Sequence, residues 1–142
     1  VEKLLEQAAQ RGCSALKLPL ALDEDGLLRA DWAPLLPMLR DEDREPAERA
    51  GVFHETMARS LVDQALEIRQ RTPFDAVGLS GGVFQNRLLT ERAVQLLKAA
   101  DMDVRLHEHI PANDGGLCFG QVIEALRKCH PGLDPGSSAR VL

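Results

Sequence analysis

The sequence predicts an α/β fold that is rich in helix and contains a small sheet. Two observations lead to this prediction. The second half reads in the order strand, turn, helix, strand, loop, helix, which implies parallel strands joined by right-handed crossovers. The first half contains a long stretch in which apolar residues recur at spacings of three and four, as in an amphipathic helix. With 142 residues, 44% of them hydrophobic, the chain fits one domain with a buried core.

The amino-terminal part predicts a helix followed by a hairpin. Residues 1–11 have an amphipathic helical pattern that ends at a glycine. Two apolar runs, 15–22 and 27–30, predict strands, and the polar stretch 23–26 between them ends in glycine, as a turn does. Pro19 favours an edge position for the first strand, because proline donates no hydrogen bond to a neighbouring strand.

A short helix and a long helix come next. Asp31 is expected to cap a helix over 32–39. Residues 41–49 are highly charged and predict a solvated connector, which passes into the longest helix, over 47–71. The apolar positions of that helix are Ala50, Phe53, Met57, Leu61, Ala65 and Ile68.

The second half supplies the predicted parallel strands. Residues 74–79 predict a buried strand, 80–82 a sharp turn and 83–100 an amphipathic helix. Residues 104–107 alternate between apolar and polar side chains, as a half-buried strand does, and 111–116 predict a loop. A last helix is expected to carry one apolar face, made of Phe119, Val122, Ile123 and Leu126.

Composition argues against several classes of function. The net charge is −5 and no basic stripe is present, so a nucleic-acid partner is not expected. No apolar run approaches the roughly 20 residues that cross a bilayer, so no membrane partner is expected. The three cysteines form no CxxC pair, which makes a reducing cytoplasm the simplest setting. The chain lacks an initiator methionine and is expected to be a piece of a longer protein.

A glycine-rich turn, 80–82, follows the first strand of the second half. Its glycines let the backbone approach a ligand closely. The helix expected from Val83 would present unpaired amides and the positive end of its dipole to an anion such as phosphate. The turn also lies at the carboxyl end of a strand, where parallel sheets bind their ligands. The alternative is that the glycines only form a tight turn.

A second glycine-rich loop, 113–116, follows the next strand. Its Asp114 could cap the last helix, which would contribute about 1 kcal/mol. The carboxylate could instead coordinate a hard or borderline cation beside a phosphate. One aspartate cannot build a metal site, so other ligands would have to come from elsewhere.

Three blocks of sequence resemble the hydrogenase-maturation carbamoyltransferases, the HypF family. Residues 79–86, LSGGVFQN, match that family's signature. Residues 110–117, IPANDGGL, with the Gly-Gln pair at 120–121, resemble its second glycine-rich segment. Upstream, residues 53–56, FHET, resemble the start of its long helix. The blocks occur in the family's order and spacing, and the resemblance covers 47–126, with 13–46 matching more loosely.

The resemblance implies a fold and an activity. The fold is an actin/Hsp70/sugar-kinase-like (RNase H-like) ATPase domain, related to the tRNA threonylcarbamoyltransferase (TsaD) family. Residues 1–130 would be its C-terminal lobe and 131–142 a flexible tail. Family members use carbamoyl phosphate and ATP to make carbamoyl adenylate. They pass the carbamoyl group to the C-terminal cysteine of a partner protein, HypE, where it becomes the cyanide ligand of nickel–iron hydrogenase.

The same resemblance implies site residues. Asn86, one turn into the expected helix, would reach the ribose or base of ATP. Asp114 would be the ligand that this lobe contributes to a divalent metal ion. No catalytic residue is implied, because the acceptor thiolate would come from the partner. The residues expected to bind the nucleotide are Ser80, Gly81, Gly82, Asn86, Gly115 and Gly116.

The chain departs from the family in what it lacks. The HxxxH pair that related enzymes place in the other lobe is absent, and so are the acylphosphatase and zinc-finger segments. Half of the active-site cleft is therefore expected to be missing. The isolated chain should bind nucleotide weakly at best and should transfer no carbamoyl group.

Some residues and functions stay open. His54 lies on an apolar helical face and is either a satisfied core residue or part of the cleft. Residues 107–109, His-Glu-His, favour a solvated strand end over a metal site, which would lack a third ligand. Cys118 is expected to pack in the last helix. The chain could also be a docking lobe for the partner, or a tRNA threonylcarbamoyltransferase, although the acidic charge and the Phe84-Gln85 pair count against the latter.

Overall fold

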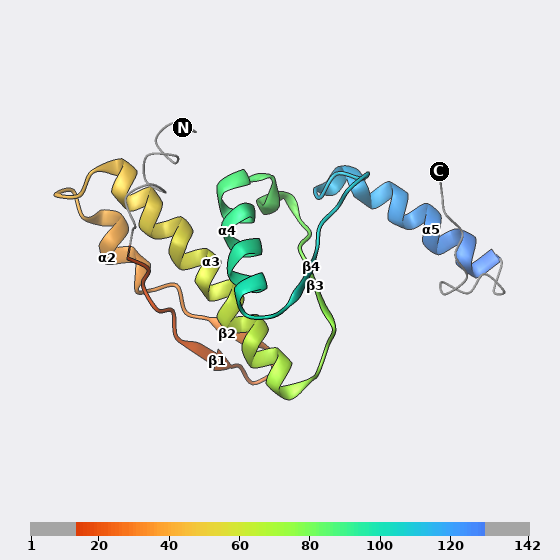
Figure 1. Ribbon diagram of the computed structural model, residues 1–142, viewed down its shortest axis with the longest axis horizontal. Helices are drawn as coiled ribbons and strands as arrows, with labels where there is room; N and C mark the ends of the chain where they lie inside the picture. Colours follow the sequence, from red (N-terminus) through yellow and green to blue (C-terminus); the bar gives the residue numbers. More distant parts are fainter. Residues whose placement is uncertain (1–13, 130–142) are drawn as a thin grey trace.

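The computed structural model describes residues 14–129, which form an elongated molecule (Figure 1). The helix predicted over 1–11 and the tail predicted over 131–142 lie outside the described residues. Two small sheets and four helices follow the predicted order within the described range. The α/β prediction, rich in helix with little sheet, is confirmed.

The predicted hairpin is present near the amino-terminal end. Strand β1 (Leu20–Leu22) pairs antiparallel with β2 (Leu28–Ala30). The Asp23 carboxylate accepts hydrogen bonds from the amides of Asp25, at 3.0 Å, and Leu27, at 2.7 Å. Aspartate in this position favours a turn because its short side chain bonds to the backbone just ahead of it.

The first helix begins later than predicted. Helix α2 (Leu35–Arg40) has Pro34 at its N-cap position and no side-chain cap. Asp31 instead accepts a hydrogen bond from the amide of Ala33 at 2.9 Å. The aspartate therefore holds the turn before the helix, and the prediction that it caps the helix was wrong.

Helix α3 (Pro46–Arg71) confirms the predicted long helix to within one residue. Proline at its start is favourable, because the first turn of a helix needs no amide donor. The charged connector is consequently shorter than the predicted 41–49, since helix already begins at Pro46. In Figure 1, α3 separates the hairpin and α2 from helix α4 (Arg87–Ala99).

The predicted parallel strands are confirmed. Strand β3 (Ala76–Gly78) pairs in parallel with β4 (Asp103–Arg105), with Val77 opposite Val104. The prediction that the first of these strands is buried was wrong, because Ala76 and Gly78 are exposed and Val77 is only half-buried. Helix α4 packs against β4 of this two-stranded sheet.

Two clusters of buried apolar side chains stabilise these layers. The first joins the segment before the hairpin to α2 and the start of α3, and consists of Leu18, Leu35, Met38 and Val52. The second joins α3, α4 and the parallel sheet, and consists of Val62, Ala65, Leu79, Ala93, Leu97 and Met102. Both turns at the carboxyl ends of β3 and β4 therefore emerge from a packed layer.

The helix predicted over 83–100 is interrupted near its start. A short 3-10 helix, η1 (Gly82–Gln85), comes first, and α4 begins only at Arg87. Asn86 lies between them with an extended backbone, φ −71° and ψ 102°. Val83 and Phe84 continue the apolar spacing of the helix, so the periodicity gave no sign of the break.

The last helix projects from the rest of the molecule. A single 3-10 turn, η2 (Asp114–Gly116), leads into α5 (Leu117–Cys129), which lies at the far end from α2 in Figure 1. The predicted apolar row is present, but it is exposed: Phe119, Val122, Ile123 and Leu126 are 42–55% accessible. Cys118 is exposed as well, so the prediction that it packs in the helix was wrong.

Candidate functional site

The two glycine-rich turns lie beside each other at the carboxyl ends of β3 and β4. The amide of Gly81 donates a hydrogen bond to the carbonyl of Ala112 at 2.7 Å. The Ser80 hydroxyl lies 3.0 Å from Nε2 of His107. A Cβ on Gly82 would be 3.9 Å from the Cβ of Asn113. The expectation that both turns open at one edge of the sheet is therefore confirmed.

Gly81 is the residue that makes the first turn possible. Its φ of 109° and ψ of 156° lie in a region that only glycine adopts without strain. This conformation reverses the chain after β3 and aims the Gly81 amide at the second loop. The amide is thereby used to join the loops, and it is not an open donor for an anion.

The helix dipole does not act at this turn as predicted. Because α4 begins at Arg87, its N-terminal end is separated from Gly81 by η1 and Asn86. Its first turn is also capped, since Oδ1 of Asn86 accepts a hydrogen bond from the amide of Leu89 at 3.1 Å. The prediction that the α-helix begins near Val83 was wrong, because a 3-10 helix without a side-chain cap occupies this position and α4 begins at Arg87.

Asn86 lies at the start of α4, and not one turn into a helix. Its Nδ2 donates a hydrogen bond to Nε2 of His54 at 2.8 Å. The other ring nitrogen of His54, Nδ1, is 2.7 Å from the carbonyl of Ala50. The half-buried imidazole is thus satisfied at both nitrogens, and it links α3 to the residue that ends the glycine turn.

In the second loop a neighbouring residue forms a cap, which was the alternative role considered for Asp114. Oδ1 of Asn113 accepts a hydrogen bond from the amide of Gly115 at 3.0 Å, so Asn113 caps η2. Asp114 is exposed and caps nothing. Its carboxylate lies in the first turn of η2, where the N-terminal end of a helix favours a negative charge.

A hollow of about 560 Å³ lies between the loops and α5. The first turn contributes Ser80, and the second loop contributes Asn113 and Gly116. Its polar side chains from the other walls are His107, Gln121, Glu124 and Lys128. Of the predicted nucleotide residues, Ser80 and Gly116 line this hollow, and Gly81, Gly82, Asn86 and Gly115 do not. The predicted metal ligand Asp114 does not line it either.

The described residues do not hold a metal ion by themselves. Within residues 14–129 no group of three or more His, Cys, Asp or Glu side chains is placed to bind one. His107 is hydrogen-bonded to Ser80. His109 lies 4.0 Å from the carboxylate of Glu108, and both of these side chains are exposed. Asp114 can offer one carboxylate to a hard cation, and the remaining ligands would have to come from outside this set.

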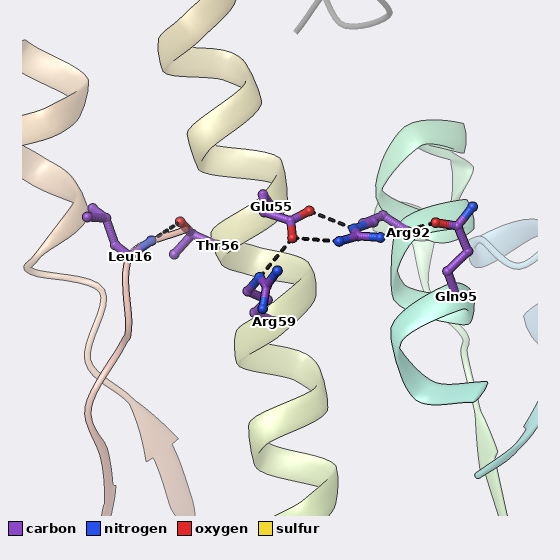
Figure 2. Close-up of polar contacts among 6 residues, drawn as sticks. All are labelled: Leu16, Glu55, Thr56, Arg59, Arg92 and Gln95. Atoms are coloured by element: carbon purple, nitrogen blue, oxygen red, sulfur yellow. Dashed lines mark hydrogen bonds and ion pairs between the residues drawn. The ribbon is translucent and has the colours of Figure 1, made fainter. Parts of the chain in front are cut away.

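A network that sequence reasoning missed fixes α3 against α4 next to His54. Figure 2 shows the Glu55 carboxylate between Arg92 of α4 and Arg59 of α3, with Oε2 2.7 Å from Nε of Arg92 and Oε1 2.8 Å from its Nη2. These bonds from Arg92 lower the pKa of the Glu55 carboxyl, and those from Arg59 add to the effect against the opposing influence of burial. On the other side of α3, the Thr56 hydroxyl accepts a hydrogen bond from the amide of Leu16 at 3.0 Å.

The signals for these missed contacts differ. Asn113 two residues before a glycine is a common turn pattern, and it could have been preferred over Asp114. The Glu55–Arg92 pair joins residues 37 positions apart, and nothing local in the sequence indicates it.

Among the described residues, no helix is both long and apolar enough to span a membrane.

Comparisons with known proteins identify relatives of this chain. The family described as carbamoyltransferase, Kae1-like domain, second subdomain, matches residues 3–121. Carbamoyltransferase HypF of Synechocystis sp. is 33% identical over 77% of this chain, and that of Rhodobacter capsulatus is 36% identical over 69% of it. The chain spans only 14% and 13% of these two relatives.

A solved structure is similar over most of the chain. The crystal structure of full-length HypF in the phosphate- and nucleotide-bound form superposes with a TM-score of 0.75 and 29% identity. The similarity covers 89% of this chain and 17% of that one. This chain belongs to the HypF carbamoyltransferase family, as the second subdomain of its Kae1-like domain.

Proposed function

We propose that this chain is the nucleotide-binding, C-terminal lobe (1–130) of a cytoplasmic carbamoyltransferase. The enzyme would use carbamoyl phosphate and ATP to form carbamoyl adenylate and would then carbamoylate the C-terminal cysteine of a HypE-like acceptor. The product thiocarbamate would supply the cyanide ligand of nickel–iron hydrogenase. The observation that carries the proposal is the hydrogen bond from Gly81 to Ala112, which places two glycine-rich turns at one edge of a parallel sheet.

In the proposed reaction, this lobe would stabilise the negative charge on the phosphate groups. Water would first cleave carbamoyl phosphate to carbamate and inorganic phosphate. An oxygen of the carbamate would then attack the α-phosphate of ATP, and pyrophosphate would leave. Transfer then forms a carbon–sulfur bond to the acceptor thiolate and breaks the bond to AMP. In the adenylation and transfer steps negative charge develops on phosphate oxygens, which positioned donors and a cation stabilise. No nucleophile is required from this chain.

The predicted residues divide this work. Gly81 and Gly116 allow the two turns to lie close together, and Ser80 and Gly116 line the hollow where the nucleotide would bind. Asn86 is held at the end of the first turn, with one amide hydrogen used by His54. Asp114 would provide one oxygen ligand to a divalent metal ion, which would neutralise phosphate charge when bound.

Exchange of pyrophosphate into ATP, dependent on carbamoyl phosphate, tests this function in the intact enzyme that contains this subdomain. Asp114→Ala should abolish the exchange, because the metal would lose the ligand that this lobe contributes. Glu108→Ala is the matched control, since this exposed carboxylate lies near the same loops without a proposed role. Normal exchange in Asp114→Ala combined with lost binding to the acceptor would instead favour a docking lobe.

A further inference from the structure

We infer that His54 is a positioning residue for the glycine-rich turn at 80–82 and for η1, which follows it. His54 acts on them through Asn86. The inference rests on the proposed function, because it concerns how the nucleotide-binding turn is held. It also settles which alternative applies to His54. The imidazole has both nitrogens engaged within the protein, so it supports the site and does not contact the nucleotide.

The neighbours of His54 determine where its proton lies. A backbone carbonyl only accepts hydrogen bonds, so Nδ1, 2.7 Å from the carbonyl of Ala50, must carry the hydrogen. In the neutral ring Nε2 is then the acceptor, and it faces Nδ2 of Asn86 at 2.8 Å. The ring of Phe53 meets the imidazole edge to face, with centroids 5.5 Å apart, which restricts its rotation.

The amide of Asn86 is fixed from both ends. Its oxygen accepts from the amide of Leu89 and its nitrogen donates to His54. Turning the amide over would place an NH₂ group against the Leu89 amide and an oxygen against the Nε2 lone pair. Both contacts would be repulsive, so His54 selects the orientation in which Asn86 caps α4.

Fixing Asn86 in turn fixes the glycine turn. The amide of Asn86 donates to the carbonyl of Val83 at 3.1 Å, which closes η1 directly after Gly81. The Thr90 hydroxyl, in the first turn of α4, donates to the carbonyl of Phe84 at 2.8 Å. The position of η1 therefore depends on α4 starting at the right residue, and α4 starts where Asn86 caps it.

Helix α3, which carries His54, is held against α4 by contacts next to the histidine. Glu55, the next residue, joins α3 to α4 through two hydrogen bonds with Arg92. Ala93 of α4 is fully buried and clusters with Val62 and Ala65 of α3, so the helices are closely packed. A continuous series of contacts thus runs from α3 through His54, Asn86 and η1 to Gly81, whose amide holds the second loop.

Two substitutions in the intact enzyme separate positioning from general stability. His54→Gln keeps an acceptor oxygen at a reach similar to that of Nε2, whereas His54→Leu removes the acceptor and keeps an apolar side chain of similar volume. We expect His54→Leu to raise the KM for ATP about fivefold to tenfold in the exchange assay, as expected for loss of one cap, with kcat within about twofold. His54→Gln should restore the wild-type KM.

A double-mutant comparison adds a result that a merely structural role would not give. In an Asn86→Ala background, His54→Leu should raise the KM no further, because the two residues act as one unit. Additive effects would overturn the inference, and so would a His54→Gln enzyme as impaired as His54→Leu.

The failure of the inference can be told apart from failure of the proposed function. If wild-type enzyme shows no exchange that requires carbamoyl phosphate, the proposed function is wrong. The contact itself is then tested on the 142-residue chain by ¹⁵N NMR of the histidine ring at alkaline pH, where histidine rings are neutral. We expect Nδ1 of His54 to be protonated and Nε2 unprotonated, with the Nε2 signal shifting in Asn86→Ala. A ring protonated at Nε2 would refute the inference independently of activity.

Discussion

At the scale of single residues, two glycines determine the shape of the candidate site for different reasons. Gly81 is required by its backbone conformation, with φ at 109°. Gly116 is required by space, because a Cβ there would lie 2.7 Å from the carbonyl oxygen of Pro111 and 3.1 Å from Cγ2 of Ile110. A backbone oxygen cannot rotate away as a flexible side chain does, so the loop itself would have to move.

Gly116→Ala should therefore destabilise the chain by about 1–3 kcal/mol, the usual cost of an added atom in a filled space. Gly120→Ala is the matched control four residues along, where a Cβ would meet nothing within 4 Å. It should leave stability unchanged or raise it by up to about 1 kcal/mol, because alanine favours helix. Urea unfolding followed by circular dichroism measures both, and equal effects would contradict the steric argument.

The role of a single residue was predictable where the backbone conformation requires that residue type. It was not predictable where two adjacent residues could both form the same cap. The pair Gly81-Gly82 between a strand and a helix correctly indicated a turn, since few other residues permit one there. Asn113 and Asp114 are adjacent and either can cap, so the sequence left the choice to the loop geometry. Because Asn113 is the cap, the prediction that remains for the exposed Asp114 is that it is a metal ligand.

At the scale of elements, the joint between α3 and α4 keeps the glycine turn in place. The Glu55 side chain, only 14% exposed, binds Arg92 through both carboxylate oxygens. The extent of α3 was predictable because its apolar spacing continues from Ala50 to Ile68. The start of α4 was not, because Asn86 as a cap overrides an apolar pattern that continues through η1.

Replacing Glu55 by Gln should lower the free energy of unfolding by about 1–2 kcal/mol at neutral pH. Hydrogen bonds to charged partners contribute about this much when solvent partly screens them. The matched control is Glu67→Gln, which breaks the exposed pair with Arg71 at the end of the same helix. That change should stay within about 0.5 kcal/mol, and a loss equal to that of Glu55→Gln would show that burial of the pair does not matter.

The same network predicts a pH dependence with a definite sign. Arg92 lowers the pKa of the Glu55 carboxyl below its ordinary value of 4.5. A lowered pKa in the folded state contributes stability that is complete above the unfolded value and is lost as the pH falls through the folded value. The difference between wild type and Glu55→Gln should therefore be constant above the ordinary pKa and should shrink in acid.

At the scale of the whole molecule, the buried core ends before the last helix. The cluster around α4 contains Leu97, which is 0% exposed. On α5, Leu126 is 49% exposed although it belongs to a regular apolar row. Sequence periodicity predicted this row correctly, but periodicity reports which side chains share a face and not whether another element covers it.

The contrast between these two leucines gives a direct test of the arrangement in the 142-residue chain. Leu97→Ala should cost about 2–5 kcal/mol, because it leaves a cavity between α3, α4 and the sheet. Leu126→Ala should change the free energy of unfolding by less than about 0.5 kcal/mol, since its side chain is already hydrated. Urea titrations of both variants supply the comparison. A large loss for Leu126→Ala would mean that α5 folds back onto the body of the chain in solution, and the open hollow between the loops and α5 would then be closed.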